Sequence, residues 1–368
     1  MKKRKVVAVL LAACLCLTMF LAVGCGEGSP GAEQGETGPA AGEGTTVTFT
    51  DSAGREVELP AEITRIVSTG PLAQIALFAL APDMLVGLAT RWDPAAEQYI
   101  DTAYYNLPVL GQFYGKGELN LEEIAKVDPQ VIIDVGEPKS SVVEDMDAIY
   151  EQVGIPTVHI EASIKTMGEA YRTLGKLLNR EEKAELLANY CEEVYSNTLE
   201  MMKEIGDDER VDLIYCTGED GLNVIAKDSF FSEIFDLVGN NIAVVDDVTS
   251  KGTGNPVDME QLVLWDPDVI IFSPDSAYQS VAGDKAWQEL TAVKNDRYYE
   301  TPEGPYCWIG FPPSVNRYMG MIWIAQLLYP DQAGYDVYQE AVKYYELFYG
   351  CELTADQYQD LVANSLLK

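Results

Sequence analysis

The sequence is poor in histidine and in basic residues. Its 368 residues include one histidine, and 25 Lys and Arg stand against 59 Asp and Glu, a formal net charge of −34. Such an acidic surface repels phosphate groups, so nucleic acid and anionic lipid surfaces are poor partners and we expect no nucleic acid. A single imidazole also disfavours a bare transition-metal site, which leaves carboxylates or a metal that arrives already chelated.

Motifs of common enzyme classes are missing as well. The chain has no P-loop, no GxSxG and no HExxH sequence. The only histidine, His159, stands between Val158 and Ile160 in a predicted strand, where a role in the core or at a sheet edge is more typical than a catalytic one. An extracellular α/β enzyme stays as an alternative, but it needs a nucleophile with a base, and the sequence shows no such pair. We expect no enzyme and no cofactor.

Cysteine pairs with metal-binding spacing are also lacking. Seven cysteines occur, and the four beyond the N-terminal region, without CxxC or zinc spacing, are Cys191, Cys216, Cys307 and Cys351. One or two disulfides would suit an extracytoplasmic protein, and buried free thiols are the alternative. The sequence leaves both interpretations open.

The N-terminus has the pattern of a targeting segment. A basic head at residues 2–5 precedes an apolar run from Val6 to Val23, and small residues then lead to Cys25. This resembles a bacterial lipoprotein cleavage site, which predicts a signal peptide over 1–24 and lipidation of Cys25; an uncleaved membrane anchor is the alternative. Residues 25–46 are polar and rich in Gly, so they predict a flexible tether. Either way, the body of the protein lies outside the cytoplasmic membrane.

Two passages of the chain read alike. Leu119 to Gly136 and Val257 to Pro274 each predict a short helix with an acid near its start, then Asp-Pro, then a buried strand. Between them a helix is predicted over 180–206, capped by Asn179 with Glu182 and ended by Gly206. The sequence therefore predicts an α/β fold of two lobes, 47–179 and 207–368, with mostly parallel sheets and a cleft between them.

Aromatic and basic residues follow the predicted strands. In parallel sheets a ligand lies beyond the carboxyl ends of the strands. The candidates there are Arg91, Trp92, Phe113, Tyr114, Lys116, Lys139, Lys251, Tyr278, Tyr306 and Trp308. Such side chains suit a flat or bulky ligand with negative charge, such as a chelated metal, although ordinary loop residues would give the same pattern. A rival ligand is an oxyanion such as molybdate or tungstate, held at helix starts after Thr69-Gly70 and Thr217-Gly218.

The ordered set of segments resembles a known family. The segments are, in order, the lipoprotein cleavage site, TDSAGREVELP, RIVSTG, NLEEIAKVDPQVII, MEQLVLWDPDVII and PPSVNRYMGMIWIAQLLYP. Together they look like the substrate-binding lipoproteins of ABC importers for iron complexes, heme and cobalamin. The resemblance implies two Rossmann-like lobes joined by one backbone helix, with a ferric siderophore, heme or corrinoid between them. The partners would be an ABC permease and its ATPase, and the protein would be a monomer.

The resemblance also implies roles for particular residues. Family members dock on the permease through one glutamate on each lobe, and the matching positions are Glu122 and Glu260; acids solvated at helix starts are the alternative. Ligand contacts in the family come from the loops that hold Arg91 and Trp92, Phe113 and Tyr114, Gly136, and Tyr306 to Trp308. The expected location is extracytoplasmic, with a lipid anchor on the bacterial membrane. Some members take molybdate or nickel, so the cargo stays open.

Overall fold

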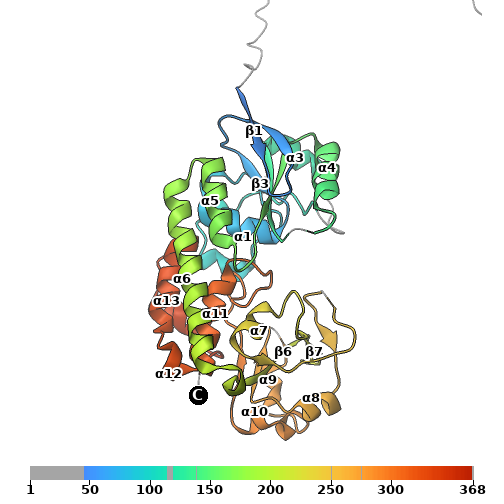
Figure 1. Ribbon diagram of the computed structural model, residues 1–368, viewed down its shortest axis with the longest axis vertical. Helices are drawn as coiled ribbons and strands as arrows, with labels where there is room; N and C mark the ends of the chain where they lie inside the picture. The colour runs from blue at the N-terminus through green and yellow to red at the C-terminus, as the bar shows by residue number, and fades with distance from the viewer. Residues whose placement is uncertain (1–44, 114–118, 138, 250, 275, 367–368) are drawn as a thin grey trace, which may run out of the picture. The chain divides into compact units, whose positions relative to one another are not determined.

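A computed structural model describes residues 45–366, apart from 114–118, 138, 250 and 275 (Figure 1). The predicted signal peptide, most of the tether, Cys25, Tyr114 and Lys116 lie outside the described residues. Within the described ranges, no helix is long and apolar enough to span a bilayer. Two α/β lobes are present, which confirms the predicted fold class.

The N-terminal lobe holds a hairpin and a parallel sheet. The hairpin pairs β1 (Thr46–Thr50) with β2 (Glu56–Pro60), and the sheet has the order β3 (Ile66–Ser68), β4 (Val131–Gly136), β5 (Thr157–Glu161). Its helices are α1 (Pro71–Leu80), α2 (Thr102–Tyr105), α3 (Leu121–Val127), α4 (Val142–Val153) and α5 (Met167–Leu178). All three sheet strands run in the same direction, so their carboxyl ends meet at one edge.

The C-terminal lobe is built on a mixed sheet. Its strand order is β11 (Tyr298–Glu300), β10 (Val269–Phe272), β6 (Asp212–Thr217), β7 (Asn223–Val224), β9 (Asn255–Pro256), with β8 (Asn240–Asn241) beside β6. Its helices are α7 (Glu233–Val238), α8 (Met259–Trp265), α9 (Tyr278–Val281) and α10 (Thr291–Lys294). The strands β6, β8, β10 and β11 pair in parallel, and β7 pairs antiparallel with both β6 and β9.

One long helix, α6 (Glu181–Ile205), joins the lobes, as the sequence predicts over 180–206. Its buried face carries apolar residues three and four positions apart, including Leu187, Cys191 and Val194. The predicted cap is wrong. Arg180 is the N-cap and its side chain makes no capping bond, whereas Asn179 ends α5 in the left-handed conformation (φ 53°). Asn suits that conformation, so the residue terminates the preceding helix instead of starting the next.

The last helices are shared between the lobes. They are α11 (Asn316–Leu328), α12 (Pro330–Ala333), α13 (Val337–Tyr349) and α14 (Ala355–Leu361). Both α11 and α13 pack on α6, α11 also contacts α7, and α13 contacts α1 (Figure 1). The rings of Phe78 in α1 and Tyr349 in α13 lie 6.2 Å apart. The predicted domain 207–368 is therefore not a separate body, because its final helices complete the core of the N-terminal lobe.

The internal repeat has the same local geometry twice. The helices α3 and α8 each have seven residues, and Asn120 and Asp258 cap them by accepting the N–H of the third helical residue. Both helices end on an aspartate in the left-handed conformation, Asp128 (φ 44°) and Asp266 (φ 41°), directly before proline. The strands β4 and β10 follow, so the two Asp-Pro passages are equivalent elements of the two lobes.

Two short apolar segments form no strand: residues 85–88 make isolated bridges only, and residues 242–245 make no strand pairing. Thr217 and Gly218 lead to the antiparallel strand β7 instead of a helix, because Gly218 has φ 82° and its carbonyl accepts the N–H of Gly221 in a turn. That turn removes one of the two helix starts predicted for an oxyanion.

Candidate functional site

A cavity of about 460 Å³ lies at the carboxyl ends of β3 and β4. Its lining comes from the N-terminal lobe and from the segment just before α7. The residues are Thr69, Gly70, Pro71, Leu72, Ala73, Gln112, Asp134, Val135, Gly136, Glu137, Lys139, Val142, Asp145, Phe230 and Phe231. This is the position at which open parallel sheets hold their ligands, so it is the candidate site of the N-terminal lobe.

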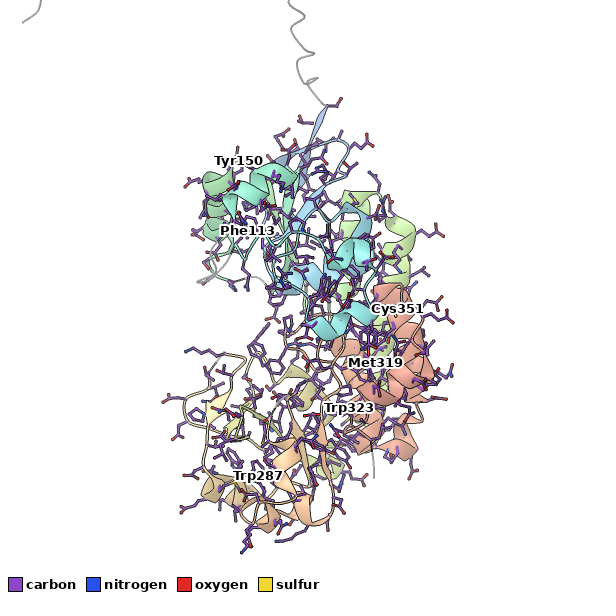
Figure 2. The ribbon with its side chains drawn as sticks, turned by 180° about the vertical axis from the view of Figure 1, so that it is seen from behind. Phe113, Tyr150, Trp287, Met319, Trp323 and Cys351 are labelled. Carbon is purple, nitrogen blue, oxygen red and sulfur yellow. The ribbon has the colours of Figure 1, made fainter. Side chains whose placement is uncertain are left out.

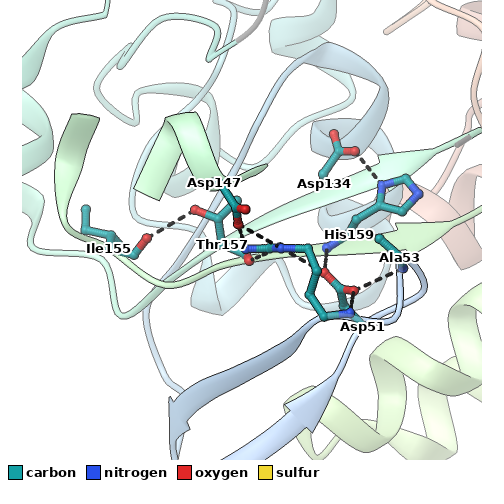
Figure 3. A network of polar contacts seen from close by, with 8 residues as sticks. Asp51, Ala53, Asp134, Asp147, Ile155, Thr157 and His159 are labelled. Atoms are coloured by element: carbon teal, nitrogen blue, oxygen red, sulfur yellow. Dashed lines mark hydrogen bonds and ion pairs between the residues drawn. The ribbon is translucent and has the colours of Figure 1, made fainter. Parts of the chain in front are cut away.

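A polar network fixes the floor of this cavity (Figure 3). The hydroxyl of Thr69 donates to one carboxylate oxygen of Asp134, and Nδ1 of His159 lies 2.7 Å from the other. Asp51 accepts the backbone N–H of His159 at 3.2 Å and a bond from the guanidinium of Arg55 at 3.0 Å. His159 is 1% exposed, so its predicted role in the core is confirmed.

Charged groups around the cavity are mainly acidic. Of the described lining residues, Asp134, Glu137 and Asp145 carry carboxylates, and Lys139 is the single base. The hydroxyl of Ser141 donates to Asp145 at 2.9 Å. The cavity therefore differs from the cation-rich site that the sequence predicts.

The start of α1 opens into the same cavity. Thr69 and Gly70 precede the helix, as the sequence predicts, and Pro71 takes the first helical position. The first bond within the helix runs from the N–H of Gln74 to the carbonyl of Gly70. The N–H groups of Leu72 and Ala73 therefore have no acceptor inside the helix, and they provide donors at the cavity.

Phenylalanine rings form a stacked platform beside this cavity. Phe231 and Phe311 lie 5.4 Å apart with 7° between their planes, and Phe311 stacks in the same way on Tyr215 at 5.6 Å. Phe230 packs edge-on against Phe231 at 5.2 Å. The three phenylalanines are half-buried, so part of this platform is accessible.

A second cavity of about 470 Å³ lies in the C-terminal lobe. It stands at the carboxyl ends of β6 and β10 and shares Phe311 with the platform. Its lining residues are Thr217, Gly218, Asn223, Gly252, Thr253, Ser273, Pro274, Glu303, Cys307 and Phe311. Each lobe thus has a cavity at its strand ends, and the phenylalanine platform contributes to both.

Arg317, at the start of α11, is a buried cation near the platform. It pairs with Glu233, donates to the carbonyl of Phe230 at 3.1 Å and lies 5.3 Å from the centre of the Phe230 ring. Burial lowers the pKa of Arg317, and burial raises the pKa of Glu233 against the opposing effect of the guanidinium. An adjoining cavity holds only about 30 Å³, room for roughly one water molecule.

Hydrogen bonds fix the lobes to each other near the site. The hydroxyl of Ser314 donates to the carbonyl of Leu72, and the hydroxyl of Tyr318 donates to the carbonyl of Ile164 at 2.6 Å. The side-chain amide of Gln74 donates to the hydroxyl of Tyr306 at 3.1 Å. The first two bonds join the start of α11 to the N-terminal lobe, and the third joins the loop that precedes this helix to the same lobe.

Two predicted ligand contacts are core residues. Trp92 and Trp308 are each 1% exposed. The indole of Trp92 packs against Phe78 at 5.1 Å, and that of Trp308 donates to the hydroxyl of Tyr345 at 3.3 Å. A ligand could not reach either ring without unpacking the core, so the structure gives no support to their predicted role.

The other predicted contacts are divided between the cavity, the core and the surface. Gly136 and Lys139 line the cavity of the N-terminal lobe. Phe113 packs into a small core beneath α3 and α4 (Figure 2), Tyr278 is buried against Tyr298, and Tyr306 packs on Trp92. Arg91 and Lys251 are exposed and line none of the cavities described above. The structure therefore does not bring the predicted set together.

Several residues of the cavities were not predicted. Asp134 interrupts an otherwise apolar strand, VIIDVG, and that interruption is a signal which could have identified it. Phe230 and Phe231 are adjacent aromatic residues just before a helix, and Phe311 and Arg317 belong to the segment GFPPSVNR. These residues could not be assigned to a shared site because long stretches of chain separate them.

The four described cysteines are free thiols, which favours the second of the two interpretations. Cys191, Cys216 and Cys307 are buried, and Cys351 is half-buried. Burial raises the pKa of Cys307 to about 11 and raises the pKa of the other three thiols as well. Such thiols are poor nucleophiles.

The chain belongs to the periplasmic binding protein family, whose family model matches residues 99–305. It is similar in structure to an ABC transporter solute binding protein from Sulfurospirillum deleyianum, with 29% identity, a TM-score of 0.79 and coverage of 86% of this chain and 99% of that one. The molybdate-bound MolA of Haemophilus influenzae shares 18% identity (TM-score 0.66; coverage 84% and 99%). IsdE of S. aureus, complexed with heme, shares 22% (TM-score 0.51; coverage 73% and 100%). No curated protein matches.

The protein is therefore a solute-binding protein of an ABC transporter. Its family binds solutes and does not consist of enzymes, and its members work outside the cytoplasm with a permease and an ATPase. The predicted membership is confirmed.

Proposed function

We propose that this protein captures a metal chelate with a flat face, a ferric siderophore, heme or corrinoid, and delivers it to an ABC permease. The stacked platform of Phe231 and Phe311 is the observation that carries the proposal. Aromatic faces pack well on planar ligands, and few other groups near the cavities offer so much apolar area. No chemistry on the ligand is required.

The volumes of the cavities favour a ligand of this size. The two large cavities measure about 460 and 470 Å³, within the range of roughly 300–1,000 Å³ that small-molecule sites occupy. The cavity beside Arg317, with about 30 Å³, is too small for a chelate. A ligand that touches both lobes would be buried further by a small closure of one lobe toward the other.

An oxyanion is the second candidate. It is favoured by the N–H groups of Leu72 and Ala73 at the start of α1, which point to an anion site of the kind that helix N-termini provide. The predicted partner helix after Thr217-Gly218 is absent, and the carboxylates of Asp134 and Glu137 lie in the same cavity. A bulky chelate therefore agrees better with the site.

The N-terminal segment and two surface acids complete the proposal. A lipid on Cys25 would hold the protein at the outer face of the bacterial membrane, with residues 25–46 as the tether. Glu122 and Glu260 are exposed at the second position of the equivalent helices α3 and α8, which suits contact with a permease. We further propose that one monomer serves each permease.

Calorimetric titration tests the ligand class. The panel contains ferric siderophores, heme, cobalamin, molybdate and tungstate, and each is measured against the native protein, Phe231→Ala, Phe311→Ala and Tyr150→Ala. Saturable binding of one chelate, weakened about tenfold by each phenylalanine variant, is expected from the loss of a buried aromatic contact. Tyr150 is an exposed aromatic residue of α4 outside the cavities, so its variant is the control. Binding of the oxyanions alone would replace the proposal with the second candidate.

A further inference from the structure

We propose that Asp134 is a specificity-determining residue that accepts a hydrogen bond from the ligand. The preferred chelate would then present an N–H or O–H donor, on an amide, hydroxyl or ammonium group, to the floor of the N-terminal cavity. This inference rests on the proposed function and defines its ligand class more narrowly.

Placing the Asp134 carboxylate in an apolar strand costs free energy, which a functional role of this side chain would explain. It stands in β4 among Val131, Ile132 and Ile133, which are all 0% exposed, and its own side chain is 14% exposed. A carboxylate in such surroundings needs hydrogen bonds to offset its lost hydration. Asp134 has them, and its remaining exposed surface faces the cavity that it lines.

Two donors hold the carboxylate in one orientation. Thr69 donates to one oxygen and His159 approaches the other at 2.7 Å. A carboxylate offers about four acceptor sites, so roughly two stay available for a ligand. With its hydrogen on Nδ1, His159 serves as a donor to Asp134, and its buried Nε2 is then an acceptor that has no partner in the described part of the chain.

A second layer of contacts fixes His159 itself. Its backbone N–H donates to Asp51, and residues 134 and 159 face each other in the pairing of β4 and β5 (Figure 3). Arg55 donates to Asp51 and to the carbonyl of Thr157 at 3.0 Å. Asp134 therefore cannot turn away from an unsuitable ligand, and a preorganised acceptor of this kind discriminates between ligands.

The surrounding charges act in the same direction. Glu137 and Asp145 also line the cavity, and Lys139 is the one base among its described lining residues. A carboxylate end of a ligand placed against Asp134 would meet another acceptor and a like charge. The N–H groups of Leu72 and Ala73 can satisfy acceptors elsewhere on the ligand. An amide or hydroxyl group has a donor for the Asp134 carboxylate and an acceptor for the N–H groups of Leu72 and Ala73.

Matched pairs of chelates test the inference on the full-length protein. Each pair keeps one metal-binding core and changes one end group: ferrioxamine B with its ammonium against its N-succinyl derivative, heme diamide against heme, and cobinamide against cobyric acid. Calorimetry gives the ratio of the two dissociation constants within each pair. For at least one core we expect the donor-bearing member to bind about tenfold more tightly, as for one hydrogen bond to a charged group.

Isosteric variants then locate the effect. Asp134→Asn keeps the shape of the side chain and offers an N–H at the cavity, and it should abolish or reverse the preference within the pair. Asp145→Asn removes the same charge from the same cavity without touching the network of Thr69 and His159. Glu200→Gln removes the same charge from the exposed face of α6. Both control variants should retain most of the preference.

The outcomes separate the inference from the proposed function. If every core that binds does so with equal or tighter affinity for the carboxylate member, the role of Asp134 is overturned and the proposed function is left intact. Equal losses of preference in Asp134→Asn and Asp145→Asn would show an effect of charge alone, which also contradicts the inference. If no core binds, the proposed chelate function fails, and the inference fails with it.

Discussion

Asp51 organises the turn between β1 and β2 through a carboxylate that is 0% exposed. It accepts the backbone N–H groups of Ala53 and Arg55 at 3.0 and 2.9 Å, together with that of His159 and the guanidinium of Arg55. The hairpin is thereby attached to β5, directly behind the network that holds Asp134. Stability and the geometry of the cavity floor thus depend on the same side chain.

Replacement of Asp51 should therefore be far more harmful than replacement of its exposed neighbour. Asp51→Ala leaves buried donors without an acceptor and should lower the free energy of unfolding by about 3 kcal/mol or more. Asp147 makes a 2.9 Å ion pair with the same Arg55 but is 59% exposed, so Asp147→Ala should cost less than about 1 kcal/mol. Urea unfolding measures both, and similar losses would contradict this account.

At the residue scale, the sequence predicted the burial of His159 but not that of Trp92 and Trp308. His159 was correctly placed in the core, because a polar residue between Val158 and Ile160 in a short strand has few other places. Trp92 and Trp308 follow strand ends in the sequence, but their large rings contribute most by filling the core. Asp134 was overlooked because its partners Thr69 and His159 become neighbours only through the pairing of β3, β4 and β5.

Two glycines of α5, Gly168 and Gly175, lie against α6. A Cβ added at Gly175 would lie 2.5 Å from the Cβ of Ala184 and 3.2 Å from the Cα of Glu181. A Cβ added at Gly168 would instead meet the end of the flexible Glu192 side chain. Substitution of each glycine by alanine therefore tests a rigid contact at Gly175 and a yielding contact at Gly168 within one helix.

Gly175→Ala should destabilise the protein, because overpacking against the backbone of α6 costs about 1–3 kcal/mol and outweighs the better helix propensity of alanine. Gly168→Ala should be neutral or stabilising by up to about 1 kcal/mol. The midpoint of thermal unfolding compares the two variants. A Gly175→Ala protein as stable as the native one would show that the helices can separate without loss.

At the element scale, long periodic segments were predictable and short ones were not. The 25 residues of α6 give a clear helical period, and the two Asp-Pro passages repeat caps, turns and strands in the same order. The strands β7, β8 and β9 have two residues each, too few to show alternation. Asn179 was predicted to cap the start of α6 and instead ends α5, because asparagine suits both ends of a helix.

The equivalent helices α3 and α8 give the whole molecule two similar exposed corners. Each carries an exposed glutamate at its second position, Glu122 and Glu260, and α8 also exposes 77% of Leu264. The fold repeats these corners once in each lobe, as a partner with two related subunits would require. Binding of the ligand and docking on the permease would then involve separate surfaces.

Reversal of both charges should consequently uncouple uptake from ligand binding. The double variant Glu122→Lys with Glu260→Lys is expected to abolish uptake in cells while it leaves the dissociation constant of the ligand unchanged. Reversal of two exposed acids on α6, Glu200 and Glu204, changes the net charge equally and should leave uptake intact. Uptake at the native rate in the first variant would refute the docking role.

The lobes and their linking helix could be predicted for the whole molecule, but the course of its last helices could not. The sequence from α11 to α14 predicts helices, but it does not indicate which surfaces of the protein these helices cover. The contacts of α13 with α1 and α6 include the rings of Tyr349 against Phe78 and of Phe348 against Tyr190, partners that stand more than 150 residues earlier in the chain. Only the folded structure brings these surfaces together.

This packing of α13 also determines the order in which the chain can fold. Phe78 and Tyr171 of the first lobe meet Tyr349 and Phe348 at 6.2 and 6.5 Å, near the very end of the chain. The first lobe therefore cannot complete its core until almost the entire polypeptide has been synthesised, and such distant contacts form late. Export of the unfolded chain, which the predicted signal peptide implies, would gain time from this arrangement.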